Sequence, residues 1–428
     1  MTATTEPVPE GASDSDYRWV VLAVGTLVVF ASLGLARFGY TTVLPAMQAD
    51  LSLDNTQAGL LASANLVGYL ALAVIGGALA SRFGPRVVIA IGLGVAGVAM
   101  VLTGLAHGAV EVAAWRALTG VGSGASNVPV MGLLAAWFAP RRRGLASGIA
   151  VAGSSVALIL LGPVVPRVLA QYGPTGWRIC WFGFGALALV VAALSMLLLR
   201  NSPAGTTAGD HARDGDASRR IRGHEAHGLQ WGAVYGSSRV WHLGAVYVAF
   251  GFSYIIYLTF FVKCLVSEGG CTPAGAGRLL MVLGWSSLLC GLIWGTVSDA
   301  IGRKWALVIV YLIQATAFSL FALWPTTAGF TLSAVLFGLT AWSIPAIMAA
   351  ACGDLLGPRL APAALGFITL FLGIGQALGP TVAGAVADVV HSLFPTMLLA
   401  AGVALLGALG AALLRPTGAE HSTPETSN

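Results

Sequence analysis

Hydrophobic residues are grouped along the chain in blocks of roughly 20, separated by short polar segments. A helix needs about 20 apolar residues to cross the roughly 30 Å of hydrocarbon in a bilayer. The pattern therefore predicts an all-α membrane protein with twelve transmembrane helices. The expected spans lie near residues 19–43, 57–80, 87–106, 110–137, 145–166, 177–199, 240–263, 274–298, 305–324, 328–352, 363–388 and 393–414.

One connection is much longer than the others. Residues 200–239 are rich in Gly, Ser, Asp, Arg and His, a composition typical of a solvated linker. We expect a six-helix bundle on each side of this linker, over residues 19–199 and 240–414. Residues 1–18 and 415–428 are expected to be polar tails.

An internal repeat relates the two halves. The turn GALASRFGPR starts at Gly77 and the turn GTVSDAIGRK starts at Gly295, an offset of 295 − 77 = 218. A Gly-Pro pair recurs at Gly162-Pro163 and Gly379-Pro380, with an offset of 379 − 162 = 217. Two six-helix halves related by a parallel repeat are typical of one large class of transporter folds.

Composition supports a membrane location. Hydrophobic residues make up 57% of the 428 residues and charged residues only 9%, whereas a soluble chain is about 25% charged. This composition excludes one large soluble core. The first 17 residues carry four carboxylates and no basic cluster, unlike a signal peptide, so the first helix is expected to remain in the mature protein.

The basic residues predict the orientation in the membrane. Of the 22 Lys and Arg residues, 16 fall in segments on the side of the two termini, whereas the segment 44–56 contains none. Because cytoplasmic segments are enriched in Lys and Arg, we expect both termini in the cytoplasm of a multi-pass protein of the cell (inner) membrane. The net charge of +5 reflects this enrichment of Lys and Arg in the cytoplasmic segments, and no nucleic-acid partner is inferred.

The five cysteines show no metal-binding spacing, and the sequence predicts no metal or cofactor. Cys264 and Cys271 flank a short loop that is expected outside the cell. A disulfide between them stays an open alternative.

The repeated turn points to a family. The turn at Gly295 resembles the cytoplasmic-loop motif Gly-x-x-x-Asp-x-x-Gly-Arg-Lys of the major facilitator superfamily (MFS), and the resemblance extends over about residues 18–415. It implies the MFS fold and a conformational latch that includes Asp299 and Arg303. The first copy departs from the motif, because Ser81 replaces the acid. The latch residues implied by both copies are Gly77, Arg82, Gly84, Arg86, Gly295, Asp299, Gly302, Arg303 and Lys304.

Further segments refine the resemblance. The run GLARFGY from Gly34 looks like a branch of poorly characterised bacterial permeases, and Arg116 resembles the fourth-helix arginine of the superfamily. The eleventh helix carries a glycine-proline motif that the family often shows on its fifth helix. The fifth helix here has Leu158 in place of the middle glycine, which weakens an exporter interpretation.

Three arginines, Arg37, Arg116 and Arg278, are expected in the outer third of the membrane, and no acidic residue lies deep in any predicted span. An ionisable group in hydrocarbon is costly and therefore marks a functional site by default. Guanidinium groups without buried carboxylates favour pairing with an anionic substrate. The alternative is that each arginine extends to the interface or caps backbone carbonyls.

Polar and aromatic side chains in other spans are expected to line the same cavity. An aromatic residue at such a position more often packs between helices, and amides often join helices by hydrogen bonds. The predicted substrate-binding residues besides the three arginines are Tyr40, Asn65, Tyr69, Asn127, Tyr254, Tyr257, Trp285, Trp342 and Gln376.

The sequence thus predicts a monomeric secondary transporter that moves a small organic anion of the carboxylate type by alternating access. Coupling is expected through proton symport or anion exchange, because no buried acid is available as a proton carrier. The alternative is proton-coupled efflux of a drug or metabolite. An enzyme is not expected, because no span contains a nucleophile with its base or a set of metal ligands.

Overall fold

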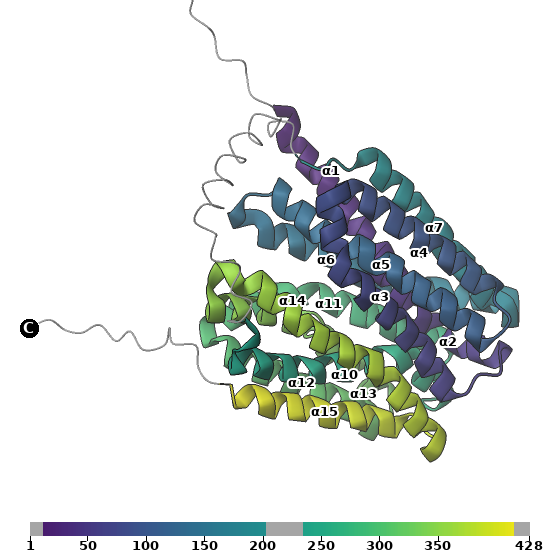
Figure 1. Ribbon diagram of the computed structural model, residues 1–428. Helices are drawn as coiled ribbons and strands as arrows, with labels where there is room; N and C mark the ends of the chain where they lie inside the picture. The colour runs from purple at the N-terminus through teal and green to yellow at the C-terminus, as the bar shows by residue number, and fades with distance from the viewer. Residues whose placement is uncertain (1–11, 203–233, 415–428) are drawn as a thin grey trace, which may run out of the picture.

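A computed structural model describes residues 12–202 and 234–414, and these residues form helices and short turns without strands. The first half folds into one group of helices, drawn from purple to blue-teal in Figure 1. The helices are α1 (Ala12–Val29), η1 (Phe30–Phe38), α2 (Gly39–Asp50), α3 (Asn55–Phe83), α4 (Pro85–Leu105), α5 (Ala109–Trp137), α6 (Pro140–Tyr172), η2 (Gly173–Thr175) and α7 (Gly176–Leu198).

The second half forms a second group, drawn from green to yellow in Figure 1. Its helices are α10 (Ser238–Ser267), α11 (Pro273–Ile301), α12 (Arg303–Leu323), α13 (Thr327–Gly338), α14 (Ser343–Val390) and α15 (Phe394–Ala412). Helix α14 contains two membrane segments, because Gly357 has a φ of 73° and interrupts the helix. Most of the expected linker, residues 1–11 of the first expected tail and all of the second (415–428) lie outside the described residues.

The described chain contains the twelve predicted membrane helices. Ten segments are long and apolar enough to cross a membrane, and one of them, Arg142–Leu198, contains both α6 and α7. The 29-residue helix α5, which carries Arg116 and Asn127, is the twelfth. The all-α fold class predicted from the apolar blocks is therefore confirmed.

The first membrane helix begins before the expected residue 19 and changes its hydrogen bonding midway. The hydroxyl of Tyr17 donates to the carbonyl of Leu198 at 2.7 Å, which ties the added first turns to α7. From Phe30 to Phe38 the helix is of the π type, and π segments inside α-helices are rare and frequent at functional sites. Arg37 lies in this segment, next to its last residue.

The two copies of the repeated turn have the same backbone conformation. Gly84 separates α3 from α4 with φ 84° and ψ 140°, and Gly302 separates α11 from α12 with φ 84° and ψ 155°. A positive φ of this kind strains any residue with a Cβ atom. The glycines spaced by 218 positions therefore form the same helix-turn-helix in each half.

Glycines bring the two halves into backbone contact at the end remote from these turns. A Cβ atom on Gly59 of α3 would lie 2.1 Å from the carbonyl oxygen of Pro380 in α14, and one on Gly277 of α11 would lie 2.0 Å from that of Gly162 in α6. The two contacts are equivalent in the repeat, because Gly277 lies 218 positions after Gly59 and Pro380 lies 218 positions after Gly162. Two equivalent backbone contacts, one from each copy of the repeat, thus join the halves at this end, which we call the closed end.

Polar contacts reinforce the closed end. The carboxylate of Asp388 accepts hydrogen bonds from the backbone N–H groups of Asn55 and Thr56, at 2.9 and 2.8 Å. It also accepts one from the Thr56 hydroxyl, so a side chain of α14 caps the first turn of α3. The ammonium group of Lys263 donates to the side-chain oxygen of Asn55.

The opposite end, which carries the repeated turns, lacks such contacts. In the described residues, hydrogen bonds between the halves occur only from mid-helix to the closed end. A Cβ atom on Gly77 or Gly295 would meet nothing within 4 Å. Within residues 12–202 and 234–414, hydrogen bonds therefore join the two halves from mid-helix to the closed end, and we call the opposite end the unjoined end. Cys264 and Cys271 are both free thiols.

Candidate functional site

Arg37 lies between the two halves with most of its hydrogen-bonding capacity unused. Its Nη1 donates to the hydroxyl of Tyr254 on α10 at 3.5 Å, and its guanidinium lies 4.5 Å from the ring centroid of Tyr69 on α3. The Nε and Nη2 atoms are buried without a hydrogen-bond partner, and no described carboxylate lies within 4 Å. A buried guanidinium in this state has donors available for an anion.

Arg116 is more deeply buried, with 1% of its surface exposed. Its Nη1 donates to the carbonyl of Ala36 at 2.5 Å, and its guanidinium lies 4.6 Å from the ring of Tyr40 and 5.3 Å from that of Trp181. Cation–π contacts of this kind stabilise a desolvated guanidinium. Arg116 therefore also anchors α5 to the first helix, directly beside Arg37.

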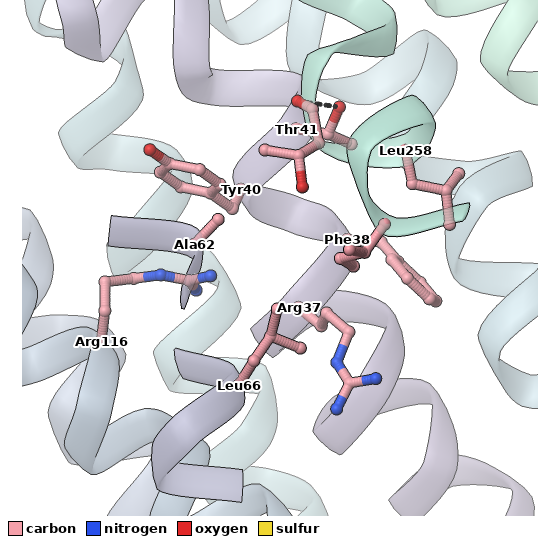
Figure 2. A pocket seen from close by; sticks show the side chains of 10 residues that line it. Arg37, Phe38, Tyr40, Thr41, Ala62, Leu66, Arg116 and Leu258 are labelled. Atoms are coloured by element: carbon pink, nitrogen blue, oxygen red, sulfur yellow. Dashed lines mark hydrogen bonds between the residues drawn. The ribbon is translucent and has the colours of Figure 1, made fainter. Parts of the chain in front are cut away.

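Both arginines line one small cavity between η1, α3, α5 and α10 (Figure 2). The cavity has a volume of about 10 Å³, which is space for about one water molecule. Its other lining residues are Phe38, Tyr40, Thr41, Ala62, Leu66, Ile255, Leu258 and Thr259. No acidic residue is among them, so no carboxylate at the cavity compensates either positive charge.

Hydroxyl and amide groups extend the site beyond Arg37. The Tyr254 hydroxyl accepts a second hydrogen bond, from Nε2 of Gln376 on α14 at 2.5 Å. The Tyr69 hydroxyl accepts one from Nδ2 of Asn127 on α5 at 2.9 Å. Because a tyrosine hydroxyl that accepts can still donate its proton, both tyrosines add donors around Arg37. Four predicted residues thus gather with Arg37 in one cluster, which we call the Arg37 cluster: Tyr69, Asn127, Tyr254 and Gln376.

Two predicted residues support Arg116 instead. The Tyr40 hydroxyl donates to the carbonyl of Ala58 at 2.7 Å, and Nδ2 of Asn65 donates to the carbonyl of Arg116 at 3.1 Å. Both side chains are buried. They hold the first helix and α5 against α3, and only Tyr40 reaches the cavity.

Other predicted residues lie outside the Arg37 cluster. Tyr257 is buried in the second half, where its hydroxyl is 2.8 Å from that of Ser333. Arg278 and Trp285 on α11 are exposed, because their face of the helix points away from the neighbouring helices. Trp342 stacks on Phe38, with ring centroids 5.5 Å apart.

Sequence reasoning missed two contacts across the centre of the molecule. The Thr41 hydroxyl donates to the carbonyl of Thr259 at 3.2 Å, drawn as a dashed line in Figure 2. The Ser155 hydroxyl accepts hydrogen bonds from the Ser287 hydroxyl at 2.7 Å and from Nε1 of Trp342 at 3.2 Å. Small hydroxyl residues are common in membrane helices and therefore give no signal by themselves. The repeat offset of 218 between Thr41 and Thr259 is the one sequence feature that could have indicated the threonine pair.

The predicted latch residues lie at the unjoined end. Arg303 donates to Asp299 at 2.5 Å and to Asp354 of α14 at 3.0 Å, so three helices of the second half meet in one ionic network. In the first copy, Nε of Arg86 donates to the carbonyl of Met196 at 2.7 Å, and Arg82 is exposed. Both sets of contacts stay within one half.

Comparison with known proteins agrees with this architecture. The model of a family described as "Uncharacterised MFS-type transporter YbfB" matches residues 29–412. The chain is 23% identical over 412 residues to the hexuronate transporter of Bacillus subtilis (strain 168), covering 91% of this chain and 94% of that protein. It is 24% identical over 420 residues to a putative tartrate transporter of Agrobacterium vitis, covering 94% of each.

Among solved structures, the fold resembles that of a bacterial homolog of the human lysosomal transporter Spinster in an inward-facing and unoccupied conformation. The TM-score is 0.75 at 18% identity, and the match covers 94% of this chain and 98% of that one. The family model spans nearly all of the described chain. The protein therefore belongs to the major facilitator superfamily of transporters, in the family described as uncharacterised MFS-type transporter YbfB.

Proposed function

We propose that this protein is a secondary transporter for a small organic anion of the carboxylate type. The observation that carries the proposal is Arg37, whose Nε and Nη2 are buried between the two halves without a partner. Leaving such donors unpaired is costly, and a carboxylate accepts two parallel hydrogen bonds from a guanidinium. Arg116 adds a second positive charge at the same cavity.

The relatives support this substrate class. Hexuronate and tartrate, named for two relatives, are both hydroxylated carboxylates. The Arg37 cluster matches that chemistry, because the guanidinium suits the carboxylate and the side chains of Tyr69, Tyr254 and Gln376 offer hydrogen bonds to hydroxyl groups.

The present conformation supports an alternating-access cycle. Among the described residues, hydrogen bonds join the halves from mid-helix to the closed end. We therefore place the entry of the solute at the unjoined end, along the half-buried side chains of Arg37 and Tyr69. The basic residues at that end favour a cytoplasmic position, so we assign the conformation as inward-facing, with both termini in the cytoplasm. The networks at Arg303 and Arg86 would meet across the halves when this end closes.

No acidic residue lines the cavity, so the substrate itself supplies the negative charge. Transport then proceeds either with a proton that accompanies the anion or by exchange with a second anion. Proteoliposomes distinguish these modes. Symport responds to an imposed pH gradient, whereas exchange requires an anion inside the vesicles.

Uptake by proteoliposomes tests the substrate class. We expect labelled galacturonate or tartrate to accumulate, and we expect unlabelled carboxylates to compete. Galactose, which has the ring of galacturonate without the carboxylate, serves as the matched control and should not compete. Transport of a cation or a neutral sugar that no carboxylate inhibits would contradict the proposal.

A further inference from the structure

A second cavity lies at the unjoined end of the second half, far from the Arg37 cluster. It is formed by the first turns of α10 and α12, the end of α15 and part of α14, and its volume is about 240 Å³. This volume is room for a phosphate group and its neighbouring atoms. The proposed transport path does not include this cavity.

The cavity wall is basic on one side. Arg239, His242, Arg303 and Lys304 line it. Arg303 is neutralised by Asp299 and Asp354, whereas Arg239 and Lys304 form no ion pair within the described residues. His242 has a ring nitrogen 2.9 Å from the carbonyl oxygen of Gly410. Two uncompensated cations therefore border a space that is large enough for an anion.

The rest of the cavity wall is apolar. It consists mainly of leucine side chains, from α10, α12, α14 and the end of the described chain: Leu243, Leu307, Leu355, Leu413 and Leu414. A soluble anion gains nothing from such a surface, whereas a lipid places a charged headgroup beside apolar chains.

Aromatic residues indicate the depth of the cavity in the membrane. Trp241 precedes His242 and is 49% exposed, and Trp305 follows Lys304 and is 54% exposed. Exposed tryptophans are enriched where the hydrocarbon meets the headgroups. The cavity between them therefore lies at the level of phospholipid headgroups.

We propose that this cavity binds the headgroup of an anionic phospholipid, with its phosphate between Arg239 and Lys304 and its glycerol and first acyl carbons against the leucines. The proposal is independent of the transported solute, because none of these residues belongs to the Arg37 cluster.

Native mass spectrometry of the purified full-length protein tests this site. Dioleoyl phosphatidylglycerol should bind roughly 30-fold more tightly than dioleoyl phosphatidylcholine, because Arg239 and Lys304 each contribute about 1 kcal/mol near a lipid surface. The double variant Arg239→Gln/Lys304→Gln should lose this preference and keep its phosphatidylcholine binding. The matched control is Arg142→Gln/Arg143→Gln, which removes two exposed charges at the same end of the other half and should retain the preference.

Three outcomes would overturn the proposal. Equal affinity for the two lipids would show that the cavity does not select anionic headgroups. An equal loss in the Arg142/Arg143 control would show general attraction to the charged surface. Displacement of phosphatidylglycerol by excess inorganic phosphate would assign the cavity to a free anion instead. A monodisperse size-exclusion profile for each variant excludes misfolding as the cause.

Discussion

The hydroxyl of Thr41 donates a hydrogen bond to the carbonyl of Thr259, and these residues occupy the same position in the two repeats (259 − 41 = 218). Two equivalent residues can touch only if both lie near the axis that relates the halves. Arg37 is one helical turn from Thr41, and its equivalent is Ile255 (37 + 218), which lines the same cavity. The positive charge at the centre of the molecule is therefore contributed by one half only.

Arg37→Lys should lose much of the affinity for the transported carboxylate although it retains the charge, because lysine lacks the planar fork that pairs with a carboxylate. Arg37→Gln should be worse. Removing a partner of a buried charge costs roughly 2–5 kcal/mol, or about 30-fold or more in affinity. Thermal-shift titration with galacturonate or tartrate measures the change.

Arg278→Gln is the matched control for Arg37, because it removes an exposed arginine from α11. We expect this variant to bind like the wild type. The anion-site proposal would be wrong if a correctly folded Arg37→Gln variant bound as tightly as the wild type.

Gly277→Ala should weaken the closed end, because the added Cβ would lie 2.0 Å from the carbonyl oxygen of Gly162. Overpacking typically costs about 1–3 kcal/mol, which corresponds to roughly five- to 150-fold in the equilibrium between closed and open forms. A cysteine at Ser63, which is buried beside Thr381, should then react faster with a thiol reagent.

Gly402→Ala is the control for this experiment, since a Cβ atom at this position of α15 would meet nothing within 4 Å. It should leave the reaction rate of the cysteine at Ser63 unchanged. The same rate in both glycine variants would show that the backbone contact at Gly277 does not hold the closed end. The measurement requires a background in which the five free cysteines are replaced.

Asp299→Asn should slow transport and leave substrate binding intact. Asp299 is remote from the Arg37 cluster. Arg303 keeps its hydrogen bonds to Asp354 of α14 and to the Ser298 hydroxyl of α11, so the three helices remain joined. The substrate-induced thermal shift should match that of the wild type while the uptake rate falls. Complete loss of binding in a folded Asp299→Asn variant would refute a latch role.

Topology can be tested with single cysteines in intact cells. A cysteine at Asp54, in the short turn between α2 and α3, should react with an impermeant thiol reagent. A cysteine at Ser218, in the linker, should react only after the cells are made permeable. Strong labelling of Ser218 in intact cells would reverse the proposed orientation.

Apolar blocks and repeat spacing were sufficient to predict the helices and the paired turns, because both depend on local sequence. They did not determine which face of a helix meets another helix. On α10, Tyr254 and Tyr257 are three residues apart, yet Tyr254 reaches Arg37 and Tyr257 packs in the core. Where every face of a helix is apolar, hydrophobicity does not distinguish the face toward lipid from the face toward protein. The sequence therefore did not show that Trp285 lies on an exposed face of α11.

The π segment is a second feature that the sequence does not reveal. Its hydrogen-bond shift arises where η1 packs tightly on α6, since a Cβ atom on Gly34 would lie 2.2 Å from that of Ala157. This contact joins residues more than 100 positions apart. Sequence position alone therefore did not predict the direction of the Arg37 side chain.

The glycine contacts at the closed end have a consequence for the energy of switching. Gly59 and Gly277 contact their partners through the backbone. Separating these surfaces therefore releases few side chains from a fixed rotamer. Little side-chain entropy is then gained or lost at these two glycine contacts as the halves part. The two states can remain close in free energy, and a single solute that binds one of them a few kcal/mol more tightly is enough to reverse their populations.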